Sequence, residues 1–272
     1  MTSRREFLAA AGALAGAAVA GAQTKKVPVI DCHVHAGHAE ALTDPWFTIA
    51  DPAEILRRMD QAGVDQACIF PINHNIYAPA NREIADICKR YPGRFIGFCR
   101  HSAITEKGVD IREAMLHEYH YLGLRGLKLH DIPNAEIMDT AKELGIPVLY
   151  HPPRVARLEE TAKAYPTVDI IVAHLGSDMS MDYREHLAAV ELAKNYPNVY
   201  LDTSTVNITR YLEKAVAEVP TEKICYGTDE PEVDTRIEIY KIRVLKLPKE
   251  KEEMILGGNM QRLLSKNQGA KA

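Results

Sequence analysis

The sequence contains few of the residues that mark several common classes of protein. Aromatic residues make up 7% of its 272 residues, with a single Trp, so it offers little for a surface that stacks on bases or sugar rings. Its five cysteines are scattered and include no CxxC pair, which argues against a disulfide-stapled scaffold. Basic and acidic residues nearly balance, 33 against 37. The resulting net charge of −4 disfavours nucleic acid as a partner.

Two kinds of segment are also missing from the sequence. Beyond residues 1–22, no apolar run approaches the roughly 18 residues of a membrane-spanning helix. We therefore expect residues 23–272 not to associate with a membrane. Neither a GxGxxG motif nor a Walker-type phosphate loop occurs. This absence disfavours a doubly wound nucleotide-binding sheet, which remains the alternative fold.

The N-terminal segment, residues 1–22, is typical of an export signal. Arg4 and Arg5 resemble the pair of a twin-arginine signal, and an Ala/Gly-rich apolar run follows as far as Ala20. The alternative, a membrane anchor, is disfavoured because the run is short and rich in glycine. We therefore expect cleavage near residue 22, export in the folded state, and a periplasmic or secreted mature protein over residues 23–272.

Apolar runs of strand length alternate with helical patterns along the mature chain. The strand-like runs are residues 27–35, 66–72, 95–102, 124–130, 147–151, 169–175, 199–203 and 223–228. Helix signals lie between them, such as Asp51 before Pro52 at a helix start and Gly63 at its end. Eight such units, about 28 residues each, predict an α/β fold, a single-domain (β/α)8 (TIM) barrel.

Polar residues gather where these runs end, which is where the active site of such a barrel lies. His33 and His35 are two residues apart on a strand, so both imidazoles should point into the barrel. Cys32 should then point the other way and pack outside it. With His151 and Asp229 from other strand ends, the two histidines form a set suited to one divalent metal. We expect zinc, with manganese, iron or cobalt as alternatives.

The motif at 30–35, Ile-Asp-Cys-His-Val-His, resembles the opening motif of the metal-dependent amidohydrolase superfamily. Further segments resemble the amidohydrolase-related family, the group that contains aminocarboxymuconate semialdehyde decarboxylase. These segments are residues 91–98, 126–130, 172–176, 226–231 and 255–264. The resemblance covers nearly all of the mature chain, in order.

The resemblance implies a role for each matching residue. His33, His35, His151 and Asp229 match metal ligands. His174 matches a residue beside the metal-bound water, where it would act as general base or electrophile. The alternative for His174 is a core histidine bonded to the backbone.

Four basic side chains near the strand ends are candidate substrate contacts: Lys128, His130, Arg100 and Arg154. Together they would form a basic rim for an anionic substrate, although solvated surface charge is the alternative. Some members of the superfamily carboxylate a lysine on the fourth strand to bridge two metals, which is a further alternative for Lys128.

These features predict an enzyme that hydrolyses an ester, lactone or amide-like bond of a small molecule. A metal-activated water would attack the carbonyl, and Asp229 or His174 would move the proton. A non-oxidative decarboxylase with the same ligand set is the second hypothesis, and a barrel that only binds a small molecule is the third. A homodimer is common among similar barrels.

Overall fold

The computed structural model describes residues 26–39 and 49–266. The expected export signal lies outside the described residues, so its cleavage remains a prediction. Within the described part of the chain, no helix is both long enough and apolar enough to cross a membrane.

The strands form two sheets, of four and six strands, that together make up the barrel, and their pairing is parallel apart from the antiparallel strand β2. Their bounds are β1 Ile30–His38, β2 Ile49–Ala50, β3 Gln66–Pro71, β4 Phe95–Gly97, β5 Cys99–Arg100, β6 Leu127–Leu129, β7 Val148–Tyr150, β8 Ile170–Val172, β9 Val199–Asp202 and β10 Ile224–Cys225. Because β4 and β5 are the two halves of one strand interrupted at Phe98, the barrel has the eight predicted positions.

The barrel closes where the last strand meets the first. Cys32 N donates to Tyr226 O at 2.9 Å, and His35 N donates to Glu230 O at 2.8 Å. A third bond joins Asp229 N to His33 O at 2.7 Å. Closure therefore brings His33 and His35, on the first strand, next to Asp229, which follows the last strand.

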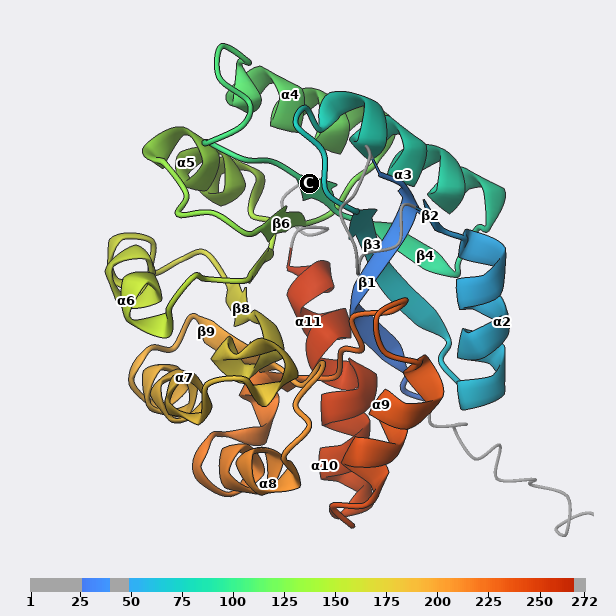
Figure 1. Cartoon of the computed structure of the whole chain (residues 1–272), viewed down its shortest axis with the longest axis vertical. Coiled ribbons are helices and arrows are strands. Elements are labelled where there is room, and N and C mark those ends of the chain that lie inside the picture. The colour runs from blue at the N-terminus through green and yellow to red at the C-terminus, as the bar shows by residue number, and fades with distance from the viewer. Residues whose placement is uncertain (1–25, 40–48, 267–272) are drawn as a thin grey trace, which may run out of the picture.

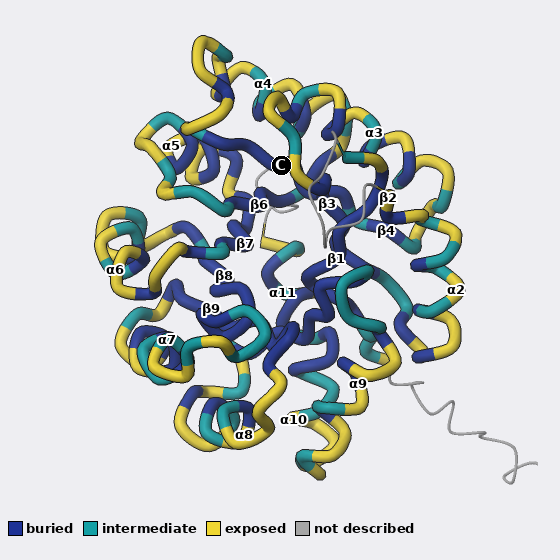
Figure 2. The backbone as a smooth tube through the Cα atoms, viewed as in Figure 1, coloured by how far each residue is buried: buried dark blue, intermediate teal, exposed yellow. Residues whose placement is uncertain are grey.

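Helices surround the barrel, with their outer faces exposed and the strands buried (Figures 1 and 2). Their bounds are α2 Pro52–Ala62, α3 Ala78–Arg90, α4 Ile111–His117, α5 Ala135–Leu144, α6 Val155–Ala164, α7 Tyr183–Asn195, α8 Thr209–Glu218, α9 Thr235–Arg243, α10 Lys249–Glu253 and α11 Asn259–Ser265. The predicted helix signals are confirmed at α2, where Asp51 accepts a bond from Ala53 N and Gly63 ends the helix at φ 76°.

Helix α11 covers the amino-terminal end of the barrel. Asn259 Nδ2 donates to Thr221 O at 2.7 Å and to Ile224 O at 2.8 Å, next to the start of β10. Met260 and Leu263 join the apolar cluster that fills the barrel. The opposite end, at the carboxyl ends of the strands, is thereby left for the polar site.

The prediction that Cys32 packs outside the barrel is wrong. The pairing of β1 with β3 shifts register between Asp31 and Val34, and such a bulge reverses the alternation of side chains along a strand. Cys32 is therefore buried in the cluster that fills the barrel, and its thiol lies 3.7 Å from Asp202 Oδ1. The bulge allows Cys32 and His33 to face the same side.

A second polar network lies outside the barrel, behind β5. His101 Nδ1 donates to Glu106 Oε2 and His101 Nε2 donates to Glu118 Oε2, both at 2.9 Å. All three side chains are buried. Burial alone would lower the pKa of His101, but the two carboxylates raise it to about 9. His101 is therefore an imidazolium held between two carboxylates.

This arrangement predicts a pH-dependent contribution to stability. Because the folded pKa of His101 lies above its unfolded value, its contribution is complete below pH about 6.5 and is lost as the pH rises through about 9. His101→Gln should lower the free energy of unfolding by about 3 kcal/mol at pH 6, and by less at pH 10. Urea unfolding at both pH values measures the difference, with exposed His117→Gln as the control. An equal loss at both pH values would contradict the assigned charge.

Candidate metal and active site

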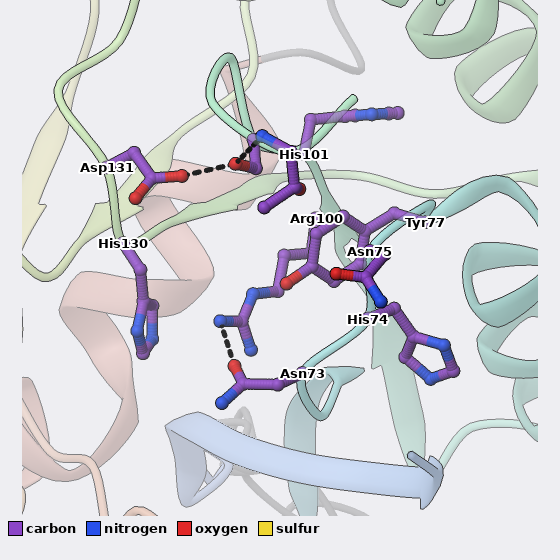
Figure 3. A pocket seen from close by; sticks show the side chains of 10 residues that line it. Asn73, His74, Asn75, Tyr77, Arg100, His101, His130 and Asp131 are labelled. Atoms are coloured by element: carbon purple, nitrogen blue, oxygen red, sulfur yellow. Dashed lines mark hydrogen bonds between the residues drawn. The ribbon is translucent and has the colours of Figure 1, made fainter. Parts of the chain in front are cut away.

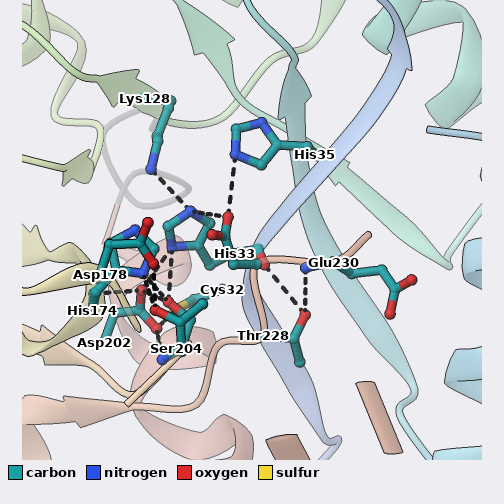
Figure 4. Close-up of polar contacts among 12 residues, drawn as sticks. Cys32, His33, His35, Lys128, His174, Asp178, Asp202, Ser204, Thr228 and Glu230 are labelled. Atoms are coloured by element: carbon teal, nitrogen blue, oxygen red, sulfur yellow. Dashed lines mark hydrogen bonds and ion pairs between the residues drawn. The ribbon is translucent and has the colours of Figure 1, made fainter. Parts of the chain in front are cut away.

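Side chains from several strands meet at the carboxyl end of the barrel (Figure 4). His33 and His35 lie on β1, Asp229 follows β10 and His174 follows β8. Asp229 Oδ1 lies 3.0 Å from His33 Nε2 and 3.2 Å from His35 Nε2. The ligand atoms of His33, His174 and Asp229 all lie within 4.8 Å of one another. Three of the four predicted ligands therefore converge directly on one point, and His174 joins them.

The hydrogen-bond network assigns the tautomers of the two β1 histidines. His33 Nδ1 donates to Asp202 Oδ2 at 2.7 Å, and His35 Nδ1 donates to Pro71 O at 3.3 Å. In the neutral rings each Nε2 therefore carries a lone pair directed toward Asp229. Partners of this kind fix the orientation of imidazoles that bind metal.

The tautomer of His174 follows from its two hydroxyl neighbours. Its Nδ1 lies 2.9 Å from Ser204 Oγ and 3.1 Å from Thr205 Oγ1. Ser204 already donates its hydrogen to Asp202, and Thr205 donates its own to Asp178. Both hydroxyls must therefore accept from His174 Nδ1–H, which leaves the lone pair on Nε2. His174 also sits in the left-handed region, at φ 57°, a strained conformation of the kind found at functional sites.

Asp202, at the end of β9, organises these histidines. Its Oδ2 accepts from His33 at 2.7 Å, from Ser204 Oγ at 2.6 Å and from His174 N at 3.3 Å. Burial would raise the pKa of Asp202, but the charge and hydrogen bond of His33 hold that pKa well below its usual range. Asp202 is therefore a buried carboxylate that is satisfied by the histidines it orients.

The charges of the site favour a bound cation. Burial lowers the pKa of His35 to about 4 and that of His151 to about 3, and it lowers the pKa of His174 strongly. These imidazoles are neutral at pH 7 and offer lone pairs. Burial and Lys128 would also lower the pKa of His33, but Asp229 and Asp202 raise it. Among the described residues, the buried Asp229 Oδ1 has no hydrogen-bond partner. Neutral imidazole nitrogens around such a carboxylate oxygen fit a divalent metal.

His151, the fourth predicted ligand, belongs to the same group of rings. Its centroid lies 4.6 Å from that of His174 and 4.9 Å from that of His130. His151 thus adjoins the converging ligand atoms of His33, His174 and Asp229 through the ring of His174. Ligation by His151 remains a prediction, because His174 stands closer to the other ligand atoms.

The four basic side chains expected at the rim have different positions. Lys128 is fully buried, with Nζ 2.9 Å from His33 Nε2 and 5.0 Å from the centre of the Phe70 ring. Burial lowers the pKa of Lys128 to about 7. Arg154, in contrast, lies on the surface before α6, with its side chain 71% exposed and 3.3 Å from Glu185. The expected rim therefore does not form as one surface, because Lys128 is buried and Arg154 is exposed.

Arg100 and His130 line a cavity of about 330 Å³ beside the metal-site residues (Figure 3). Arg100 Nη1 donates to Pro71 O at 3.1 Å, the carbonyl that also accepts from His35. His130 contacts His151 on one side and the cavity on the other. Two of the four predicted substrate contacts therefore line one cavity, which adjoins His151 through His130.

Several functional candidates escape reasoning from the sequence. Thr205, which follows β9, contacts His174 Nδ1, and Asp178, which follows β8, accepts the hydrogen of the Thr205 hydroxyl. Glu232 follows β10, and burial together with Asp229 raises its pKa to about 8. Their only signal in the sequence is a position shortly after a strand end, which does not tell which way a loop side chain points.

Comparison with known proteins defines the family. A family model described as amidohydrolase matches residues 30–266. The chain therefore belongs to the amidohydrolase family of enzymes, which confirms the resemblance found in its motifs. No curated protein matches the chain.

Solved structures share the fold at low sequence identity. The 5-carboxyvanillate decarboxylase of Sphingomonas paucimobilis is 15% identical with a TM-score of 0.70, covering 88% of this chain and 99% of its own. A dihydroxybenzoic acid decarboxylase of a Polaromonas species, solved with manganese and 2-nitroresorcinol, is 17% identical with a TM-score of 0.69, covering 89% and 98%. A probable 2-pyrone-4,6-dicarboxylic acid hydrolase of Acinetobacter baumannii, solved with citric acid, is 14% identical with a TM-score of 0.68, covering 87% and 99%.

The network around Asp202 predicts an effect on metal affinity. Asp202→Asn should weaken the binding of Mn²⁺ by about 10- to 100-fold, because the amide no longer orients His33 as a carboxylate does. Titration of the metal-free protein with Mn²⁺ by calorimetry measures the change. Asp169→Asn, at the amino-terminal end of β8, is the matched control. Unchanged affinity in the Asp202 variant would show that His33 needs no such partner.

Proposed function

We propose that the protein is a metal-dependent hydrolase that acts on an ester, lactone or amide-like bond of a small anionic molecule. The observation that carries this proposal is the assigned tautomer of His174. Its Nε2 lone pair, next to Asp229, suits a base that takes a proton from water. Decarboxylation requires instead an acid that delivers a proton to carbon.

His33, His35, His151 and Asp229 would hold one divalent cation, with zinc as the first candidate and manganese, iron or cobalt as alternatives. When bound, such a cation would polarise an oxygen atom of the substrate or of water. Manganese in the Polaromonas decarboxylase supports the choice of a divalent metal.

The chain's own residues account for the movement of protons. His174 Nε2 accepts a proton from the water molecule whose oxygen adds to the carbonyl carbon of the substrate. Ser204 and Thr205 keep the ring in place through Nδ1. When the C–O or C–N bond breaks, His174 returns the proton to the leaving atom. Asp229 is the alternative carrier, and Lys128 would hydrogen-bond a substrate oxygen.

Three further expectations belong to this proposal. The substrate is small and anionic, which is supported by the carboxylic acids and nitroresorcinol named with the similar structures. The mature protein works in the periplasm or outside the cell after twin-arginine export. It forms a homodimer.

A metal-dependent non-oxidative decarboxylase is the second candidate. The observation in its favour is the fold shared with decarboxylases of carboxyvanillate and dihydroxybenzoate. The same ligands would serve, and His174 would then protonate the product carbon. A panel assay separates the candidates: the Zn²⁺- and Mn²⁺-loaded protein is given lactones, esters and aromatic acids, and acid release is compared with release of carbon dioxide. Carbon dioxide alone would replace the hydrolase proposal, and no turnover with either metal would support a barrel that only binds.

The role of His174 can be tested apart from metal binding. His174→Ala should retain bound metal and lose about 10²- to 10⁴-fold in kcat, since it removes the base. His33→Ala and Asp229→Ala should lose metal and activity together. Metal content per chain and kcat are measured side by side, with exposed His120→Ala as the control. Near-normal turnover of His174→Ala would overturn its role as base, and loss of metal would make His174 a ligand.

A further inference from the structure

Arg100 is a buried cation whose bonds, as far as the described residues show, are to neutral groups. Its side chain is almost fully buried. Nη1 donates to Pro71 O and Nη2 donates to Asn73 Oδ1. Within the described residues, Arg100 forms no ion pair with a carboxylate. Burial accordingly lowers the pKa of its guanidinium. The carboxylates of Asp131 and Asp229 act on Arg100 only at longer range than an ion pair. A buried cation without a directly paired carboxylate is costly, so its retention needs a reason.

The cavity beside Arg100 offers a place for that counter-charge. Its wall includes His130, whose Nε2 is buried without a hydrogen-bond partner among the described residues. Figure 3 shows His130 and Arg100 extending toward the same space. Asp131 also lines the cavity, but it accepts a bond from the Ser102 hydroxyl and forms no ion pair with Arg100. Arg100 and His130 thus present a cation and an imidazole to the cavity.

A dedicated framework holds the backbone of Arg100 in place. Asn81 Oδ1 accepts from Arg100 N at 3.0 Å, and Asn81 Nδ2 donates to Arg100 O at 3.1 Å. The same Asn81 amide donates to Glu118 Oε1 at 2.7 Å. Glu118 belongs to the buried pair of carboxylates around His101. The charged network outside the barrel thus anchors the residue that points inward.

The guanidinium is supported by the same framework. It lies 5.1 Å from the centre of the Tyr77 ring, a cation–π distance. Tyr77 N donates to Glu106 Oε1 at 2.8 Å, and Glu106 also holds His101. Both the backbone of Arg100 and the ring under its guanidinium are therefore tied to one buried cluster, Glu106, His101 and Glu118.

The position of Arg100 is also linked to the metal-site residues. The carbonyl of Pro71 accepts from His35 Nδ1 at 3.3 Å and from Arg100 Nη1 at 3.1 Å. His130 contacts the His151 ring, with centroids 4.9 Å apart. A ligand in the cavity would therefore lie next to the candidate metal-site residues His35 and His151.

We propose that Arg100, together with His130, binds a carboxylate of the substrate that is remote from the bond to be cleaved. Tyr77 and Asn81 act as positioning residues through the buried Glu106–His101–Glu118 cluster. This inference rests on the proposed function and adds to it a substrate class: small molecules with a reactive carbonyl or carboxyl group and a second carboxylate. Planar guanidinium donors match a carboxylate, which explains an arginine at this place.

Binding measurements test the subsite without any need for turnover. The probes are dicarboxylates from malonate to isophthalate, each paired with its mono-amide, titrated into the Mn²⁺-loaded protein by calorimetry. At least one dicarboxylate should bind about 10- to 100-fold more tightly than its mono-amide, because a charged hydrogen bond is lost in the amide. Arg100→Gln should remove that preference, Arg100→Lys should restore part of it, and surface Arg154→Gln should leave it unchanged.

The positioning residues have a separate signature. Tyr77→Leu and Asn81→Ala should weaken the dicarboxylate by several-fold while leaving the affinity for the mono-amide unchanged. A merely structural role would change both affinities together. Thermal unfolding confirms that each variant is folded, and Tyr77→Phe, which keeps the ring, is the conservative control.

The outcomes separate this inference from the proposed function. A dicarboxylate preference that depends on Arg100, in a protein without hydrolase or decarboxylase activity, would support the subsite and contradict the proposed function. Turnover combined with a preference that Arg100→Gln leaves intact would contradict the subsite alone. The subsite is also contradicted if no dicarboxylate binds more tightly than its mono-amide.

Discussion

The hydrogen bond from His33 Nδ1 to Asp202 Oδ2, 2.7 Å long and fully buried, is the contact on which the site depends. A buried carboxylate must be surrounded by donors, and Asp202 obtains them from His33, Ser204 and the backbone of His174. By accepting these hydrogen bonds, Asp202 fixes the ring hydrogen of His33 on Nδ1. Through the Ser204 hydroxyl it also fixes the ring hydrogen of His174 on Nδ1. One carboxylate on β9 therefore aligns lone pairs that come from β1 and from the end of β8.

Burial gives this alignment its chemical value. Desolvation keeps His35, His151 and His174 neutral, whereas Asp229 and Asp202 favour positive charge at His33. Neutral donors and nearby carboxylates in a buried pocket stabilise a cation more than the same groups would in water. The polar groups are in place before any ligand arrives, so little reorganisation is needed.

The alternation of side chains along β5 joins the interior of the barrel to a second network outside it. Arg100 points to the cavity and the next residue, His101, points to the helices, where Glu106 and Glu118 hold it. The outer cluster contains a charge that burial opposes, and the inner residue lacks a carboxylate partner among the described residues. One role accounts for the cost of burying both charges: the outer cluster is a rigid support that holds the long side chain of Arg100 in one orientation at the cavity.

Local patterns in the sequence determined the alternation of strands and helices, the closed parallel barrel and the end of it at which polar side chains gather, since apolar periodicity and helix caps depend on near neighbours. They also predicted that His33, His35 and Asp229 lie together, because the carboxyl ends of parallel strands meet at one end of a barrel. The tertiary structure alone decided that a bulge turns Cys32 inward, that Lys128 is buried against His33, and that Arg154 stays on the surface. It also decided that Glu106 and Glu118 enclose His101. These outcomes depend on register, loop direction and contacts between residues distant in the chain, for which no short-range pattern exists.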